Sequence, residues 1–240
     1  MADRPFTILS TGSLGPPGNR VSEKEDYPGS IVIEDIPFIR ILLNSDEHTR
    51  YQVLALAEEK QVVVFTSTNA VAAVGGIIRN KPDWTIYCVG NFTRKSAAAA
   101  FDGARIAGTE TNAENLAVKM IGDQVKRAVF FCGDQRRDVL PDKLKGYGIP
   151  MQELVVYQTQ ATPVRLKKEY DAVLFFSPTA VTSFFSINTL SQQTVLFALG
   201  GTTARALTRF SNKEVMLSPA PDKASLFQMA IAYGQSHPII

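Results

Sequence analysis

The sequence predicts an α/β protein made of two similar domains, each a parallel sheet covered by helices. Three observations lead to this prediction: a repeat at a constant offset, a regular alternation of short apolar runs with helical patterns, and a second copy of the repeat that lacks its completing strand. The chain has 240 residues, of which 45% are hydrophobic, which is enough for one large domain or two compact ones.

The repeat is clearest around two serines. VVVFTSTNAVAAV aligns with AVLFFSPTAVTSF, which places Ser67 on Ser177, 110 residues later. The same offset brings IYCVGNFTRKSA onto LFALGGTTARAL, and further on it brings Leu116 onto Leu226. Because three separate segments keep one offset, we expect the two copies to fold into equivalent strand and helix units.

The predicted elements follow from the spacing of apolar residues. Near the N-terminus, Phe6–Ser10 and Ser30–Ile36 are extended in character, and the atypical segment 13–29 between them is rich in Gly, Pro and charge. In each copy, apolar runs end in small polar residues and lead into helical patterns, for which Ser67 and Asn112 are natural N-caps. The alternation of strand and helix predicts parallel sheets with helices on their faces. The predicted helices cover residues 68–79, 93–101, 112–125, 136–147, 179–188, 202–210 and 223–234.

The segment VFFCGDQRRDVLPDKLKGYGIPMQELVVYQT separates the two copies. It reads as a strand, a basic turn, a helix stopped by Gly146 and Gly148, and a final strand, and it completes the first module. No such unit follows the second copy, so an N-terminal strand is expected to complete its sheet. We therefore predict a discontinuous domain of residues 1–38 and 160–240, an inserted domain of residues 43–156, and two chain crossings between them.

Composition argues against several classes of protein. The formal net charge of +2 and the lack of a basic stripe argue against nucleic-acid binding. The apolar runs are far shorter than the roughly 20 residues of a membrane span, and no secretory signal is recognisable, so we expect a cytoplasmic monomer. Cys88 and Cys132 end apolar runs and are expected to be reduced core thiols. His48 and His237 have no partners at metal-site spacing, so no metal is predicted.

Five loops that follow predicted strands form the candidate binding site. In open parallel sheets, ligands bind beyond the C-terminal ends of the strands, where loops lead into helix N-termini. Glycines and free backbone amides in such loops suit carboxylates or phosphates, so we expect an anionic ligand between the two domains. The predicted residues are Ser67, Thr68 and Asn69; Gly90, Asn91 and Thr93; Gly133, Arg136 and Arg137; Ser177, Pro178 and Thr179; and Gly200, Gly201, Thr202 and Thr203.

Individual residues of these loops also have a purely structural interpretation. Ser67, Ser177, Thr93 and Thr203 could each be only a helix N-cap. The two arginines at 136 and 137 are expected to start a helix, where a bound anion would relieve their conflict with the helix dipole, although such a turn can also be merely solvated. No strand is followed by a dinucleotide or nucleoside triphosphate loop, and no Ser, His and acid set can be assembled.

Five segments together resemble one known family. VFFCGDQRRDVLPDKLKGYGIPMQELVVYQT, DAVLFFSPTAVTSFF and LFALGGTTARAL resemble the corresponding segments of uroporphyrinogen-III synthases, and VVVFTSTNAV with YCVGNFTRKSA resembles the family's other copy. The resemblance covers roughly Val62–Met229. It implies two α/β domains joined by a two-stranded ribbon, with the N-terminal strand in the C-terminal domain.

The same resemblance implies a function. The family's enzymes use no cofactor and convert a linear tetrapyrrole, hydroxymethylbilane, into uroporphyrinogen III with inversion of ring D and loss of water. Tyr157 in ELVVYQT matches the family's ribbon tyrosine and is implied to be the catalytic acid, since a phenol is a protonated donor at neutral pH. The alternative for this residue is an aromatic side chain that only packs on the ribbon.

Other hypotheses stay open. The family usually has a helix between its first strand and the strand that leads to the ribbon, whereas this chain has Gly15, Pro16, Pro17 and Gly18 there. The competing function is a two-domain protein that binds an anionic small molecule without catalysis, and it predicts no isomer-selective turnover. A nucleotide-dependent enzyme would require a phosphate-binding loop.

Overall fold

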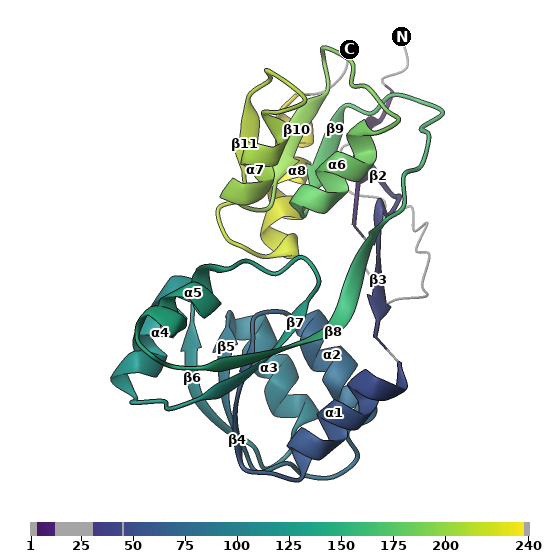
Figure 1. The fold of residues 1–240 in the computed structure, drawn as a ribbon. Coiled ribbons are helices and arrows are strands. Elements are labelled where there is room, and N and C mark those ends of the chain that lie inside the picture. The colour runs from purple at the N-terminus through teal and green to yellow at the C-terminus, as the bar shows by residue number, and fades with distance from the viewer. Residues whose placement is uncertain (1–3, 13–30, 45, 238–240) are drawn as a thin grey trace. The chain divides into compact units, whose positions relative to one another are not determined.

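A computed structural model describes residues 4–12, 31–44 and 46–237, which fold into two compact units (Figure 1). The inserted unit comprises Ile41–Thr159, and the discontinuous unit comprises Met1–Arg40 with Gln160–Ile240. The atypical segment 13–29 and Ser30 lie outside the described residues.

The inserted unit is built on a six-stranded sheet with the order β3-β8-β7-β4-β5-β6. From β8 to β6 the neighbouring strands pair in parallel. Helices α1, α2 and α3 pack on one face of this sheet, and α4 and α5 pack on the other (Figure 1). The strands are β3 (Ile39–Leu43), β4 (Gln61–Phe65), β5 (Trp84–Val89), β6 (Arg105–Glu110), β7 (Ala128–Gly133) and β8 (Met151–Ala161). The helices are α1 (Glu47–Ala57), α2 (Thr68–Ile77), α3 (Asn91–Ala100), α4 (Ala113–Gly122) and α5 (Val139–Gly146).

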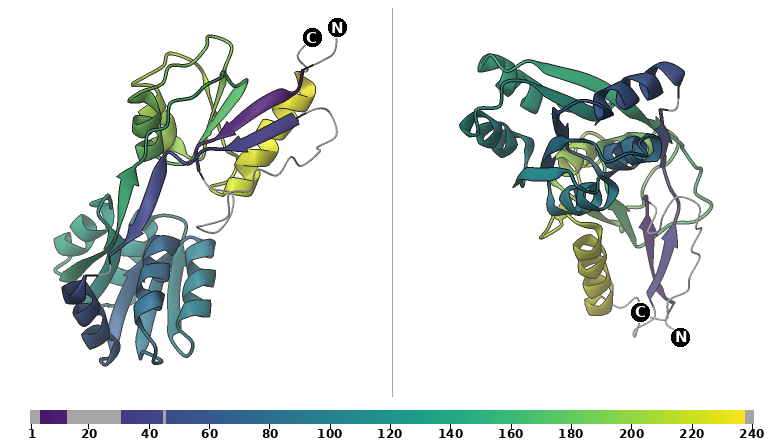
Figure 2. Two further views of the ribbon diagram at one scale, coloured as in Figure 1. Left: turned by 90° about the vertical axis from the view of Figure 1, so that its right-hand side faces the viewer. Right: turned by 90° about the horizontal axis from the view of Figure 1, so that it is seen from below.

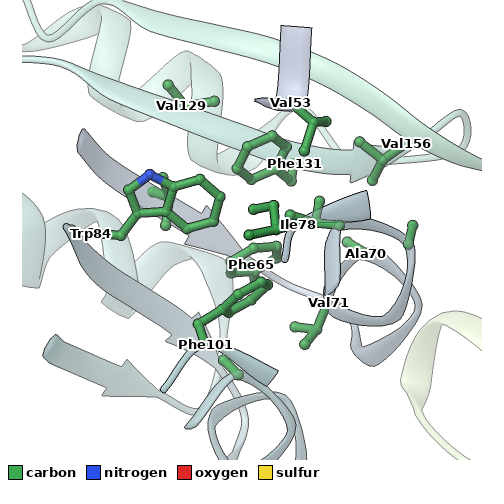
Figure 3. Close-up of a cluster of buried hydrophobic side chains, with 14 of the residues drawn as sticks. Val53, Phe65, Ala70, Val71, Ile78, Trp84, Phe101, Val129, Phe131 and Val156 are labelled. Carbon is green, nitrogen blue, oxygen red and sulfur yellow. The ribbon is translucent and has the colours of Figure 1, made fainter. Parts of the chain in front are cut away.

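The core on the α2 face is centred on Phe65 of β4 (Figure 3). Its ring stacks on those of Phe101 and Phe131, with ring centroids 5.4 Å apart in both pairs. Trp84 packs against the same rings, and its indole Nε1 donates a hydrogen bond to the carbonyl oxygen of Leu56 at 3.0 Å. Because all four rings are buried and interlocked, the end of β4 and the loop that follows it are held firmly in place.

The discontinuous unit has a five-stranded parallel sheet with the order β11-β10-β9-β1-β2. Helices α6 and α7 pack on one face, and α8 packs on the other, where Figure 2 shows it beside β1 and β2. The strands are β1 (Phe6–Ser10), β2 (Ile31–Asp35), β9 (Ala172–Phe175), β10 (Val195–Ala198) and β11 (Val215–Leu217), and the helices are α6 (Pro178–Phe185), α7 (Gly201–Leu207) and α8 (Lys223–Ser236).

The prediction that an N-terminal strand completes this sheet is confirmed. β1 lies between β9 and β2, with Ile8 opposite Ala172 on one side and Ile33 on the other. The carboxylate of Asp171, just before β9, accepts hydrogen bonds from the Thr7 backbone N at 2.8 Å and from the Arg4 guanidinium at 2.7 Å. These contacts fix the register of β1 against a strand that is distant in sequence.

The internal repeat is also confirmed. Helices α2, α3 and α4 begin at Thr68, Asn91 and Ala113, and α6, α7 and α8 begin 110 residues after each of them. The strand register repeats as well, because Val62 is opposite Thr85 in the inserted unit and the equivalent residues of β9 and β10 are opposite each other in the discontinuous unit. One pattern of apolar and polar residues therefore produces the same strand and helix unit twice.

The chain passes between the two units in β3 and β8. The backbone N of Asn44 donates to the Val156 carbonyl oxygen at 2.8 Å, and the backbone N of Thr162 donates to the Phe38 carbonyl oxygen at 2.9 Å. Since residue numbers rise on one strand as they fall on the other, β3 and β8 pair in the antiparallel sense and form the predicted two-stranded ribbon.

Two helix predictions need correction. The helix predicted at 136–147 begins only at Val139, because Pro141 is tolerated only in the first turn of a helix. Helix α1 was not among the predicted helices, although Asp46 is a good N-cap and accepts a hydrogen bond from the Thr49 backbone N at 2.9 Å.

Cys88 and Cys132 are buried free thiols, as predicted, and lie on opposite faces of the sheet. Burial raises the pKa of each thiol to about 11, so neither is a thiolate nucleophile at neutral pH. Among the described residues, no group of three or more His, Cys, Asp or Glu side chains could hold a metal ion. In the same part of the chain, no helix combines the length and apolar character of a membrane span.

Candidate active site

Ser67 shapes the loop that follows β4. Its backbone is extended, with φ −149° and ψ 139°, and its Oγ accepts a hydrogen bond from the Asn69 backbone N at 3.1 Å. Ser67 is therefore the N-cap of α2, as predicted, because a short oxygen side chain satisfies one of the unpaired amides at a helix start. Asn69 is half-buried behind this cap, whereas Thr68 is exposed at the first helical position.

The loop after β5 depends on Gly90. This residue has φ 81°, a left-handed conformation that favours glycine, and its backbone N donates to the Glu110 carbonyl oxygen at 2.8 Å. Gly90 is the N-cap of α3, so the interpretation of Thr93 as a cap is wrong, and its side chain is instead buried in the helix. Asn91 is exposed at the first position of α3.

The loop after β7 is joined to β8 by a series of hydrogen bonds. The Asp134 backbone N donates to the Tyr157 carbonyl oxygen at 3.1 Å, and the Thr159 backbone N donates to Asp134 Oδ1 at 2.9 Å. Gln135 Nε2 then donates to the Thr159 carbonyl oxygen at 3.1 Å. Because these contacts involve both the backbone and side chains, the loop and the end of β8 form one rigid edge.

The two arginines of this loop differ from the prediction. They precede α5 rather than start it, so the expected conflict with the helix dipole does not arise. The guanidinium of Arg136 forms ion pairs with Asp138 and Glu153, which compensate its charge within the protein. Arg137 is exposed in the same loop. Proline at 141 was the signal in the sequence that would have placed them outside the helix.

A β-bulge turns Tyr157 toward α2. Along β8, Cys132 is opposite Val155 but Gly133 is opposite Tyr157, so Val156 is an extra residue on this strand. In a regular strand Val156 and Tyr157 would face opposite sides of the sheet, whereas here both pack against the core on the α2 face. β-Bulges are frequent next to functional sites, where they redirect a side chain.

The ring of Tyr157 rests directly on the backbone of Gly133. A Cβ atom at Gly133 would lie 2.4 Å from Cζ of the tyrosine and 2.8 Å from its hydroxyl oxygen, which is far closer than normal contact. Only glycine therefore allows the ring to occupy this position.

The phenol of Tyr157 is half-buried and protonated at neutral pH. Burial raises its pKa above the ordinary value, and the nearby Asp134 adds to this effect. Hydrogen bonds from the side chains of Ser67 and Asn69 lower the pKa, but not enough to cancel the rise. The structure thus brings three predicted site residues, Ser67, Asn69 and Gly133, next to the predicted acid.

The discontinuous unit carries the equivalent loops. Ser177 is the N-cap of α6 and accepts from the Ala180 backbone N at 3.2 Å, and Pro178 is at the first helical position, where its missing N–H costs nothing. Thr179 is half-buried.

Gly200 is the N-cap of α7, and the helix begins at Gly201. Thr202 is half-buried, whereas Thr203 is buried within the helix and is not a cap, so that interpretation is also wrong for this residue.

One cation at the C-terminal edge of this sheet was not among the predicted site residues. Lys223 is the first residue of α8, beside Asp35, and its Nζ lies 5.3 Å from the centroid of the Phe176 ring. Asp222 caps this helix by accepting from the Ser225 backbone N at 2.8 Å. The repeat offset was the available signal, since it aligns Asp222 with the predicted N-cap Asn112.

A protein-family model described as uroporphyrinogen-III synthase HemD matches residues 29–228. The chain is 28% identical to the uroporphyrinogen-III synthase of Saccharomyces cerevisiae over 180 residues, which covers 64% of this chain and 65% of that protein, just under two thirds of its length.

Two solved structures share the fold. One is the uroporphyrinogen-III synthetase of Helicobacter pylori, with a TM-score of 0.68 and 14% identity over 95% of this chain and 99% of that one. The other is a mutant uroporphyrinogen III synthase of Thermus thermophilus, with a TM-score of 0.65 and 16% identity over 97% of this chain and 100% of that one.

Proposed function

The chain belongs to the uroporphyrinogen-III synthase family, and from this we propose that it converts hydroxymethylbilane into uroporphyrinogen III, with inversion of ring D and loss of water. The observation that supports the proposal most strongly is the protonated phenol of Tyr157 at the C-terminal edge of a parallel sheet. It lies among hydrogen-bonding side chains and beside a loop that has no motif for a nucleotide. This arrangement suits a reaction that needs one proton donor and many anion contacts.

We assign the acid role to Tyr157. Its hydroxyl donates a proton to the departing hydroxyl of the bilane, so that the C–O bond breaks and water leaves. The electron-rich pyrrole that remains becomes an azafulvenium cation, which the substituted carbon of ring D attacks to form the spiro intermediate. Fragmentation and reclosure through the free carbon of ring D then invert the ring and release a proton, which can restore the phenol.

Hydrogen bonds to the phenol oxygen support this role. A phenolate forms for part of the cycle, and donors that contact its oxygen stabilise it relative to the buried neutral phenol. The side chains of Ser67 and Asn69 act in this direction, because both lower the pKa of Tyr157. Burial alone would raise the pKa of the phenol further from neutral pH, whereas these contacts lower the pKa and make the phenol a better proton donor.

The strand-end loops provide the proposed contacts for the carboxylate arms. Helices α2 and α6 begin directly after β4 and β9, and the backbone amides of a helix start can bind carboxylates without a formal positive charge. Lys223 adds a cation on the edge of the discontinuous unit. We propose that groups of this kind bind the carboxylate arms of the substrate, which is the contribution of positioning to the rate. The prediction that one ligand contacts the loops of both units stays a prediction.

The decisive experiment supplies freshly made hydroxymethylbilane to the purified protein. The products are oxidised to porphyrins and isomers I and III are separated by chromatography. Enzymatic turnover gives isomer III, whereas the bilane closes by itself to isomer I. If heat-denatured and native protein both gave only isomer I while the native protein bound the bilane, the competing hypothesis of a binding protein without catalysis would be correct.

A further inference from the structure

A basic groove lies at the N-terminal edge of the inserted sheet, whereas Tyr157 lies at the C-terminal edge. The groove has a volume of about 580 Å³ and is formed by the first residues of β4 and β6, by β5, by the residues just before β7 and by the C-terminal end of α4. Five cations and one carboxylate line it: Lys60, Arg105, Lys119, Lys126, Arg127 and Asp123. This surplus of four positive charges is twice the formal net charge of the whole chain, which is +2.

The one carboxylate is compensated by groups of the protein itself. Lys119 Nζ donates to both oxygens of Asp123 at 2.6 Å, and the hydroxyl of Tyr87 donates to Asp123 Oδ2 at 2.8 Å. The other four cations are exposed and form no ion pair in the described part of the chain: Lys60, Arg105, Lys126 and Arg127. Like charges that line one groove repel each other, and a bound anion would relieve this repulsion.

The dipole of α4 accounts for only part of the charge. Cations are favoured at the C-terminal end of a helix, and Lys119 lies in the last turn of α4. Lys60 and Arg105 lie at the starts of β4 and β6, where no helix dipole stabilises them. Their presence in the same groove therefore needs another explanation.

The internal repeat shows that the fold itself does not require these charges. In the discontinuous unit, 110 residues later, the equivalents of Lys60, Arg105, Lys119, Lys126 and Arg127 are Tyr170, Val215, Met229, Ser236 and His237. None of these five carries a formal charge when histidine is neutral. Tyr87 and Asp123 likewise correspond to Phe197 and Tyr233, whose rings pack edge to face with centroids 5.8 Å apart. The same strand and helix unit is thus built once with apolar contacts here and once with a concentration of positive charge.

The early end of α4 opens the groove. Helices α4 and α8 begin at equivalent positions, but α4 ends at Gly122 after 10 residues, whereas α8 continues to Ser236 and has 14 residues. The chain turns away after α4 because Gln124 has a left-handed backbone with φ 57°, and the Val125 backbone N donates to the Met120 carbonyl oxygen at 3.1 Å. The inserted unit therefore lacks the last helical turn that covers this edge in its counterpart.

We propose that this groove binds a small polyanion that carries several phosphate or carboxylate groups. Its volume is in the range of small-molecule sites. The planar guanidinium groups of Arg105 and Arg127 suit two oxygens of one such group, and the lysines act as point charges around them. A ligand with a single negative charge would leave most of the cations uncompensated. This site is separate from the strand-end loops around Tyr157, so the proposal does not depend on the proposed function.

The test titrates the full chain, labelled with nitrogen-15, with tripolyphosphate and separately with citrate at low salt. Backbone amide signals of residues 124–127 should shift and saturate with at least one of the two probes. Tighter binding of tripolyphosphate would identify a phosphate-bearing ligand, and tighter binding of citrate would identify a polycarboxylate. The signals of Ser67 and Ser177 report separately on anions at the C-terminal edges of the two sheets. If neither probe shifted the signals of residues 124–127, the proposal would be overturned.

A matched pair of double variants separates a specific site from general attraction to a basic protein. Lys126→Gln with Arg127→Gln should weaken binding by roughly tenfold or more, because hydrogen bonds to charged groups are lost. Arg165→Gln with Lys167→Gln removes the same two residue types from exposed positions of the discontinuous unit and should leave the affinity unchanged. Equal weakening in the two double variants would overturn the proposal.

A second variant removes a cation from a different element. Arg105→Gln changes an exposed side chain on β6 and leaves the turn after α4 intact, so it should weaken binding severalfold with little change in Tm. Unchanged affinity in Arg105→Gln and in the Lys126→Gln and Arg127→Gln double variant would show that these cations do not form one site.

Discussion

Replacing Gly133 with alanine would place a methyl group inside the volume that the ring of Tyr157 now fills. The new Cβ would lie 2.4 Å from Cζ, 2.6 Å from Cε2 and 2.8 Å from the hydroxyl oxygen, whereas ordinary contact begins at 3.4 Å. The ring therefore has to retreat by about 1 Å, and a misplacement of this size costs on the order of a hundredfold in rate. We expect kcat for formation of isomer III to fall by about this factor.

A control separates this displacement from loss of stability. Gly108 on β6 is packed under the ring of Tyr87 in a similar way, and a Cβ there would lie 2.7 Å from Cδ1 of that tyrosine. Both alanine variants should lower Tm, since overpacking costs about 1–3 kcal/mol. Only Gly133→Ala should lower kcat. Equal kcat in the two variants, measured with the isomer assay well below both melting temperatures, would refute the view that the position of the Tyr157 ring controls the rate.

Three further predictions can be tested with the same protein. Tyr157→Phe should lower kcat by roughly a hundredfold or more without changing the circular dichroism spectrum, because it removes the acid and keeps the ring. The share of isomer I among the products should increase. Full activity with an unchanged isomer ratio would exclude the acid role. Ser177→Ala or Thr203→Ala should raise KM by only a few fold, since neighbouring amides can still bind a carboxylate, and a loss as large as that of Tyr157→Phe would contradict this. Burial alone would raise the pKa of Asp171, but the hydrogen bonds from Arg4 and Thr7 outweigh burial and lower this pKa. The ionised carboxylate therefore stabilises the fold fully above its unfolded-state pKa of about 4, and this stabilisation is lost as the pH falls through the lower pKa of the folded protein. Asp171→Asn should therefore lower Tm at pH 7, and the difference from wild type in thermal melts should shrink as the pH falls below about 4; a difference independent of pH would show that charge is not the cause.

Much of the fold could be predicted from the sequence because local patterns determine it. Helix starts depend on a cap and the residues just after it, and Ser67, Ser177 and Asn112 all carried that signal. The place of the N-terminal strand in the discontinuous unit followed from a single argument, namely that a parallel sheet needs its faces and its neighbouring strands covered. The repeat offset then transferred each conclusion from one unit to the other.

The sequence predictions were wrong or incomplete where a single residue outweighs the surrounding pattern, or where a contact depends on tertiary packing. Pro141 outweighs the helical pattern before it, so the basic turn remains a loop. Thr93 was considered as an N-cap, but it lies in the first turn of α3. The N-cap is Gly90, which has a left-handed backbone conformation. The contact of Tyr157 with Ser67 depends on a bulge, and no pattern of alternation in β8 indicates an extra residue.

The position of β1 in the middle of its sheet has a consequence for synthesis on the ribosome. The inserted unit is one continuous stretch of chain and can fold as soon as it has emerged, whereas Ile8 must wait for Ala172 before its sheet can form. At ordinary elongation rates this delay is on the order of ten to thirty seconds. During that time β1 is an exposed apolar strand, because β9, one of its two neighbours in the sheet, has not yet been synthesised. The nascent chain then depends on chaperones to protect β1, or on rapid pairing once β9 emerges.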